Sequence, residues 1–141
     1  MAEYSAVAIQ TIAANQNALF TDTTSPCNKG FVIHRPGSGQ FTLRGCTPNC
    51  RAKYRVDFNG NIAVATGGTA GAISVAIALN GEADLSTQAI VTPAAVGDYF
   101  NVAMGTDVWI PKGCCFEVSV KNTSGQAIDM QNANITITRI G

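Results

Sequence analysis

Charge is scarce in this sequence, and the two signs are equal. Only 13% of the 141 residues are charged, and nine Lys and Arg residues stand against nine Asp and Glu residues. A protein that binds nucleic acid neutralises phosphates with a basic excess. We therefore expect no nucleic-acid partner.

Long apolar runs are missing as well, and no basic segment followed by an apolar core opens the chain. A bilayer-spanning helix needs about 20 mostly apolar residues, and a secretory signal has a basic start before its apolar core. The sequence therefore predicts no membrane association and synthesis in the cytoplasm.

Histidine is nearly absent, since His34 is the only one. Any Ser-His or Cys-His catalytic arrangement would have to use this residue, and the glycine-rich "TGGTAG" stretch lacks the lysine and the helix of a phosphate-binding loop. We predict that the protein is not an enzyme.

Metal-binding patterns are weak. His34 could complete a zinc site with Cys27, Cys46 and Cys50, but this spacing matches no strong zinc motif. Three acids in loop-like stretches do not form the alternating oxygen ladder of a calcium loop and suit solvated turns better; they are Glu82, Asp84 and Asp98. We predict no metal and no other cofactor.

Five cysteines cannot all pair within one chain, and we expect most of them to be buried small hydrophobes. Cys46 and Cys50 flank the turn "TPN" and either form a disulfide after release from the cell or stay free. Cys114 and Cys115 are neighbours, so we expect them to point to opposite faces, one into the core and one to a surface.

Alternating apolar and polar residues, separated by glycine and proline turns, are plentiful. After a bent N-terminal strand, the alternating stretches cover residues 30–35, 40–45, 53–64, 73–81, 89–111, 114–124 and 133–140. No amphipathic helix of useful length is present. Such spacing predicts an all-β fold, a jelly-roll β-sandwich of about eight to ten antiparallel strands, with residues 1–141 forming a single domain.

The stretch "RAKYRVDFNG" separates charged from apolar residues at every second position. Its cations Arg51, Lys53 and Arg55 share one face, and Arg44 ends the preceding strand. These four cations could form a patch that docks on an acidic surface of a capsid or a neighbouring subunit. The alternative is a solvated strand edge whose charges prevent aggregation.

The strand "ISVAIALNG" has one face of large aliphatic residues and one face of small residues. Small side chains allow another backbone to approach closely, so Ser74, Ala76 and Ala78 are candidates for a trimer interface. The alternative is a quiet solvent-facing surface.

The order of several motifs resembles that of a known family. The segments "QTIAANQNALFTD", "GSGQFTLRG", "KYRVDFNGNIAV", "ISVAIALNG", "DVWIPKGCCFEVSVKNTS" and "NANITITRI" are similar to trimeric jelly-roll domains of the complement-component and tumour-necrosis-factor type. Within that type, the chain looks like small stand-alone proteins of Firmicutes phages and prophages, and more distantly like the tips of collagen-like spore-surface glycoproteins.

This resemblance implies a homotrimer whose subunits pack one sheet against a shared axis, without catalysis. No collagen-like stalk precedes the domain here, so we expect a cap or decoration: a structural phage protein on the capsid surface of the virion, as a capsid decoration or head-fibre component. The major capsid protein or another virion protein would then be its partner. The alternative is an adhesin tip that binds bacterial surface glycans through Tyr99, Phe100 and Trp109.

Overall fold

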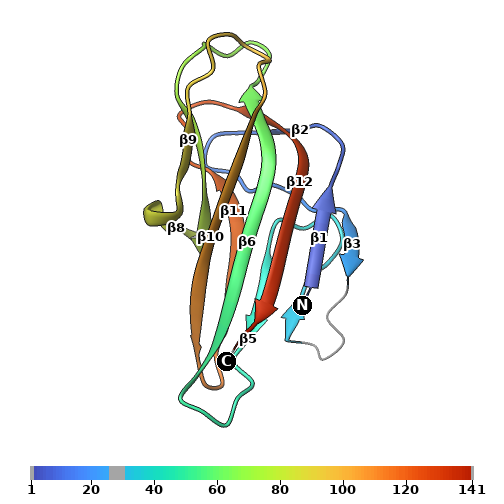
Figure 1. Ribbon diagram of the computed structural model, residues 1–141, viewed down its shortest axis with the longest axis vertical. Coiled ribbons are helices and arrows are strands. Elements are labelled where there is room, and N and C mark those ends of the chain that lie inside the picture. Colours follow the sequence, from blue (N-terminus) through green and yellow to red (C-terminus); the bar gives the residue numbers. More distant parts are fainter. Residues whose placement is uncertain (1, 26–30, 141) are drawn as a thin grey trace.

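Two antiparallel β-sheets pack face to face in the computed structural model, which describes residues 2–25 and 31–140 (Figure 1). The strands within these residues are β1 (Ala2–Ala6), β2 (Gln10–Ile12), β3 (Asp22–Ser25), β4 (Val32–Ile33), β5 (Phe41–Arg44), β6 (Arg51–Val64), β7 (Ile73–Leu79), β8 (Glu82–Ala83), β9 (Ala89–Val91), β10 (Phe100–Pro111), β11 (Cys115–Asn122) and β12 (Ile128–Arg139). One short 3-10 helix, η1 (Leu85–Thr87), precedes β9. The predicted all-β jelly-roll sandwich is confirmed, and strands of two or three residues such as β2, β8 and β9 raise the number above eight to ten.

The two sheets differ in strand length. Sheet A has the order β10-β6-β12-β1-β3, with β2 beside β12, and sheet B has the order β4-β5-β11-β7-β8, with β9 beside β7. Strands β6, β10 and β12 have 14, 12 and 12 residues and run the length of the molecule (Figure 1). We call the end with the loops 65–72 and 92–99 the apex and the end with the β5–β6 loop the base.

Within the described part of the chain, no helix is long and apolar enough to cross a bilayer.

Strand β6 follows the alternation that its sequence predicts. Tyr54 and Val56 are fully buried and Phe58 is nearly so, whereas Arg51 and Arg55 are exposed. The buried residues join one continuous core between the sheets, to which β11 adds Val118 and Val120. Burial of this size is the main stabilising contribution to such a fold.

A buried amide joins the two sheets near the apex. The Asn122 side chain, at the end of β11 in sheet B, is fully buried. Its amide group donates hydrogen bonds to the carbonyl oxygens of Ile12, Ala13 and Gln126 at 3.0, 3.3 and 2.9 Å. Its carbonyl oxygen accepts from the Ser124 hydroxyl at 2.6 Å and from the Ser124 backbone N–H at 3.0 Å. Every polar atom of this side chain is thus satisfied.

Strand β7 is buried on both faces, which corrects one prediction. Ser74, Ala76 and Ala78 are 6%, 0% and 0% exposed within the single chain. The Ser74 hydroxyl bonds to Thr123 at 2.7 Å and accepts from Gln88 at 3.0 Å. These three side chains therefore offer no open surface to another copy, because the chain's own segments cover them.

Candidate functional site

The outward face of sheet A is broad and carries mainly short side chains. Cross-strand rows follow from the register: Ala103 lies beside Asn59, Asn59 beside Asn134, and Asn134 beside Ser5. The next row toward the base joins Gly105, Asp57, Thr136 and Glu3. Because the rows cross β10, β6, β12 and β1 without an intervening loop, this face can approach another surface closely.

A row of charges crosses β6 and β10 toward the base. Arg55 Nε lies 3.1 Å from Asp57 Oδ1, and Arg55 Nη1 lies 3.5 Å from Asp107 Oδ1. Asp107 Oδ2 is also 3.4 Å from Lys53 Nζ. A Cβ at Gly105 would clash with Asp57 Oδ1 and with Arg55 Nη2. The missing side chain therefore lets the Arg55–Asp57 pair lie against the β10 backbone.

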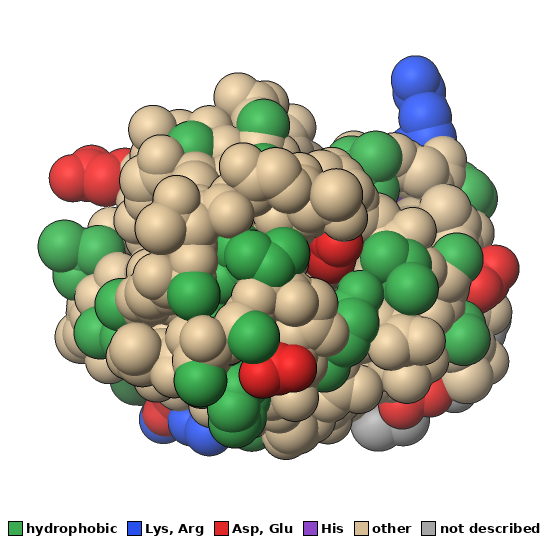
Figure 2. All heavy atoms as spheres, turned by 90° about the horizontal axis from the view of Figure 1, so that it is seen from above, with side chains coloured by type: hydrophobic (Ala, Val, Ile, Leu, Met, Phe, Trp, Pro, Cys, Tyr) green, Lys and Arg blue, Asp and Glu red, His purple; other side chains and the backbone are tan. Residues whose placement is uncertain are grey.

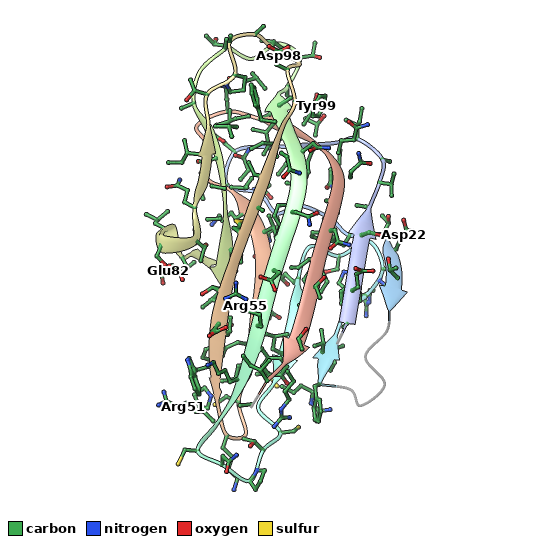
Figure 3. All side chains as sticks on the ribbon, in the orientation of Figure 1. Asp22, Arg51, Arg55, Glu82, Asp98 and Tyr99 are labelled. Carbon is green, nitrogen blue, oxygen red and sulfur yellow. The ribbon has the colours of Figure 1, made fainter. Side chains whose placement is uncertain are left out.

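An exposed tryptophan ends this row. Trp109 is 47% exposed, and its ring lies 4.6 Å from Arg51 Cζ and 4.7 Å from Lys53 Nζ. Cation–π contacts of this kind hold long cationic side chains over the ring. We call the whole group the ion–aromatic row; its members are Arg51, Lys53, Arg55, Asp57, Asp107 and Trp109 (Figure 3 labels Arg51 and Arg55).

The predicted four-cation patch is not assembled. Arg44 lies in β5 of sheet B, whose outward face is on the other side of the sandwich from β6. Lys53 and Arg55 each have a carboxylate partner, so the row holds three cations and two carboxylates. Sequence reasoning missed Asp107 and assigned Trp109 to a glycan-binding set instead, although the alternate positions of these two residues in one stretch indicated a shared face.

Large hydrophobic side chains are exposed at the apex. Val96, Tyr99 and Phe100 are 42%, 36% and 44% exposed. Figure 2 looks down on this end and shows hydrophobic groups beside acidic ones.

Partial burial, together with the nearby carboxylate of Asp129, raises the pKa of the Tyr99 phenol above its ordinary value of 10.0.

The apex loops are braced by hydrogen bonds. Gly97 N–H donates to the Val64 carbonyl at 3.2 Å, and the Gln126 amide bonds to both backbone groups of Thr69. A hollow of about 320 Å³ lies between residues 65–69 and residues 126–127. The predicted glycan-binding set is divided, because Tyr99 and Phe100 lie here whereas Trp109 lies near the base.

The candidate metal ligands are not brought together. His34 is half-buried, with its ring stacked on Phe41 at 4.3 Å, and its Nε2 is 3.0 Å from the Ser38 carbonyl. Cys27 lies outside the described residues. Asp84 caps η1 by accepting from Ser86 N–H at 3.1 Å. Among residues 2–25 and 31–140, no group of three or more His, Cys, Asp or Glu side chains can hold a metal ion.

The described cysteines are exposed, which corrects the prediction that most of them are buried. Cys46, Cys50, Cys114 and Cys115 are all free thiols on the surface. Cys46 and Cys50 lie in the β5–β6 loop, Cys114 lies in the β10–β11 turn, and Cys115 is the first residue of β11. Neither member of the Cys114–Cys115 pair is therefore in the core.

Comparison with solved structures identifies the architecture. The globular domain of zebrafish complement 1qA protein superimposes with a TM-score of 0.58 at 12% identity, over 96% of this chain and 94% of that one. The Eiger tumour necrosis factor of S. frugiperda superimposes with a TM-score of 0.69 at 10% identity, over 99% of this chain and 91% of that one. The fold is a complement-component and tumour-necrosis-factor-like jelly roll. No family model and no curated protein matches the sequence.

Proposed function

We propose that the protein is a non-catalytic structural component of a phage virion, which assembles as a homotrimer through the outward face of sheet A. The observation that carries this proposal is the breadth of that face, with Ala103 on β10 next to the short polar side chains of Asn59 on β6 and Asn134 on β12. Small residues let two backbones approach closely, and a face whose rows cross four strands without a loop can make a continuous contact.

Sheet B is the weaker candidate for this contact. The small residues of its strand β7 are already buried within one chain. The loop that carries β8 and η1 also projects beside β7 (Figure 1). We therefore place the contact between copies on sheet A.

The ion–aromatic row lies on the same face of sheet A, so we assign its docking role to a neighbouring subunit. Its three cations follow one another on β6, with Asp57 after them and Asp107 beside Arg55 on β10. An uneven charge pattern of this kind fixes the register of two surfaces that meet. A threefold ring closes through a head-to-tail contact, in which one patch of each subunit meets a different patch of the next. The ion–aromatic row would thus fix the register between one subunit and the next.

The first experiment measures the mass of the unaltered protein in solution by multi-angle light scattering, and we expect a trimer. Ala103→Arg should give a folded monomer, because a long cation on this face prevents close approach. The matched control is Thr42→Arg on the outward face of sheet B, which should stay trimeric. A monomeric unaltered protein, or dissociation by the control alone, would contradict the proposal.

The position on a virion rests on the resemblance of the sequence to phage and prophage proteins. We propose a capsid decoration or head-fibre component on the capsid surface, with the major capsid protein or another virion protein as partner. The fold is compatible with this role because it offers a rigid sandwich with two distinct ends.

A second candidate function is a tip that binds bacterial surface glycans. Its support is the exposure of Val96, Tyr99 and Phe100 at the apex, since aromatic rings with exposed faces can stack on sugars. Binding of the labelled protein to purified cell walls should then be lost in Tyr99→Ala/Phe100→Ala and kept in Trp109→Ala. Equal binding by both variants would exclude the apex.

A further inference from the structure

Three cysteines and two cations line one hollow at the base of the sandwich. The hollow has a volume of about 330 Å³, and its lining includes Arg44, Cys46, Lys112, Cys114 and Cys115. One side comes from the β5–β6 loop and the other from the β10–β11 turn, both at the base in Figure 1. None of these residues belongs to the ion–aromatic row or to the apex.

Backbone hydrogen bonds hold the two sides of the hollow together. Gly45 N–H donates to the Cys114 carbonyl at 2.8 Å, and Gly113 N–H donates to the Gly45 carbonyl at 3.1 Å. A Cβ at Gly45 would clash with the Pro111 carbonyl oxygen. The turn therefore approaches the loop as closely as two backbones can, and Cys46 directly follows the contact point.

The charge of the hollow is positive. In the described part of the chain, neither Arg44 nor Lys112 forms an ion pair, unlike Lys53 and Arg55 in the ion–aromatic row. Two unpaired cations attract an anionic reagent. The thiols beside them are free and exposed, so a small reagent can reach them.

We propose that this hollow is a thiol–disulfide exchange site for small anionic disulfides, and that the product is a disulfide from Cys46 to Cys114 or Cys115. One protein thiolate attacks the reagent, forms a mixed disulfide and releases one reagent thiolate. A second protein thiolate then attacks the protein sulfur of the mixed disulfide and releases the other reagent thiolate. The protein loses two electrons and two protons, which the reagent gains as two thiols.

The bond is expected to cross the hollow, because a disulfide between the adjacent Cys114 and Cys115 would be strained. The product would join the β5–β6 loop covalently to the β10–β11 turn. This inference does not depend on trimerisation or on attachment to a virion.

The test is treatment of the reduced, full-length protein with oxidised glutathione, followed by mass spectrometry of the intact chain and of its peptides. We expect the loss of two hydrogens and a peptide that joins Cys46 to Cys114 or Cys115. Cys46→Ser should instead accumulate a glutathione adduct, because the resolving thiol is missing. The matched control Cys50→Ser removes a thiol that lies outside the hollow and should react like the unaltered protein. A Cys46–Cys50 bond, or no reaction, would overturn the proposal.

A second arm tests the charge of the hollow. We compare the reaction rate with oxidised glutathione to that with neutral hydroxyethyl disulfide, in the unaltered protein and in Arg44→Gln/Lys112→Gln. In Arg44→Gln/Lys112→Gln, the reaction with oxidised glutathione should be about fivefold slower, because the cations attract this anionic reagent. The reaction with the neutral disulfide should change little. Arg51→Gln/Lys53→Gln is the control and should change neither rate. An unchanged ratio in the first variant would show that the cations do not select the reagent.

Discussion

Asn122 shows at the residue scale how one side chain connects the two sheets. Replacing it with Leu keeps a side chain of similar size but leaves three carbonyl oxygens and the Ser124 hydroxyl without this partner. Because each buried unsatisfied group costs about 1–3 kcal/mol, Asn122→Leu should lower the free energy of unfolding by about 3–5 kcal/mol. Urea denaturation measures this loss. Asn49→Leu in the exposed β5–β6 loop is the control, and an equal effect of both would contradict the assigned role.

Tyr99 provides a second residue-scale prediction, which concerns pH. Partial burial first, and then the Asp129 carboxylate, raise the pKa of the Tyr99 phenol in the folded chain above 10.0. The folded state thus favours the neutral phenol, so this contribution to stability is present below about pH 10 and is lost as the pH rises through the folded-state value. Asp129→Asn should lower the pKa of Tyr99 only in part, because the burial remains.

The measurement is an ultraviolet titration of tyrosinate, with the curve of Tyr99→Phe subtracted. Glu82→Gln, on the β8 strand beside η1, is a control that should leave the pKa of Tyr99 unchanged. If Asp129→Asn raised this pKa, the assigned electrostatic cause would be wrong.

At the scale of elements, strand β6 carries the cations that we assign to the contact between subunits. Replacing Arg51, Lys53 and Arg55 with Ser should leave the chain folded, because exposed ion pairs contribute only about 0–1 kcal/mol each. Trimers of this variant should dissociate at higher protein concentrations than trimers of the unaltered protein. High salt should also weaken the unaltered trimer, since exposed charges are screened over about 10 Å at 0.1 M ionic strength.

Analytical ultracentrifugation over a dilution series measures this effect. The matched variant replaces three cations outside the row with Ser: Arg35, Arg44 and Lys112. It should dissociate like the unaltered protein at each salt concentration. If the β6 variant behaved in the same way, the row would be only a solvated edge.

Alternation within a strand predicts the inward faces of β6 and β11, but it fails for the outward face of β7 and for the Cys114–Cys115 pair. The inward face of β6 and the core positions Val118 and Val120 of β11 are where the pattern places them. Neighbours across strands could not be predicted, because register depends on the fold as a whole. Arg44 precedes β6 closely in the sequence yet lies in the other sheet, and Trp109 meets Lys53 only because β10 pairs with β6. The exposed cysteines were missed because their residue type is usually buried.

At the scale of the whole molecule, the proposed role makes a prediction about copy number. Mass spectrometry of purified virions should find the protein in hundreds of copies per particle if it decorates the capsid, because a capsid repeats its surface sites many times. A few copies per particle would instead favour a tip with the apex directed outward. Absence from purified virions would contradict both placements.

Because β10 is long, substitutions near its two ends are expected to have independent effects on free energy. Tyr99 and Trp109 are ten residues apart along nearly continuous strand, which corresponds to about 33 Å. Sites this far apart without shared partners usually have additive effects on free energy. A double-mutant cycle of Tyr99→Ala and Trp109→Ala should thus give a coupling energy below about 0.5 kcal/mol. Either end of the sandwich could then acquire a new binding specificity while the opposite end keeps its own.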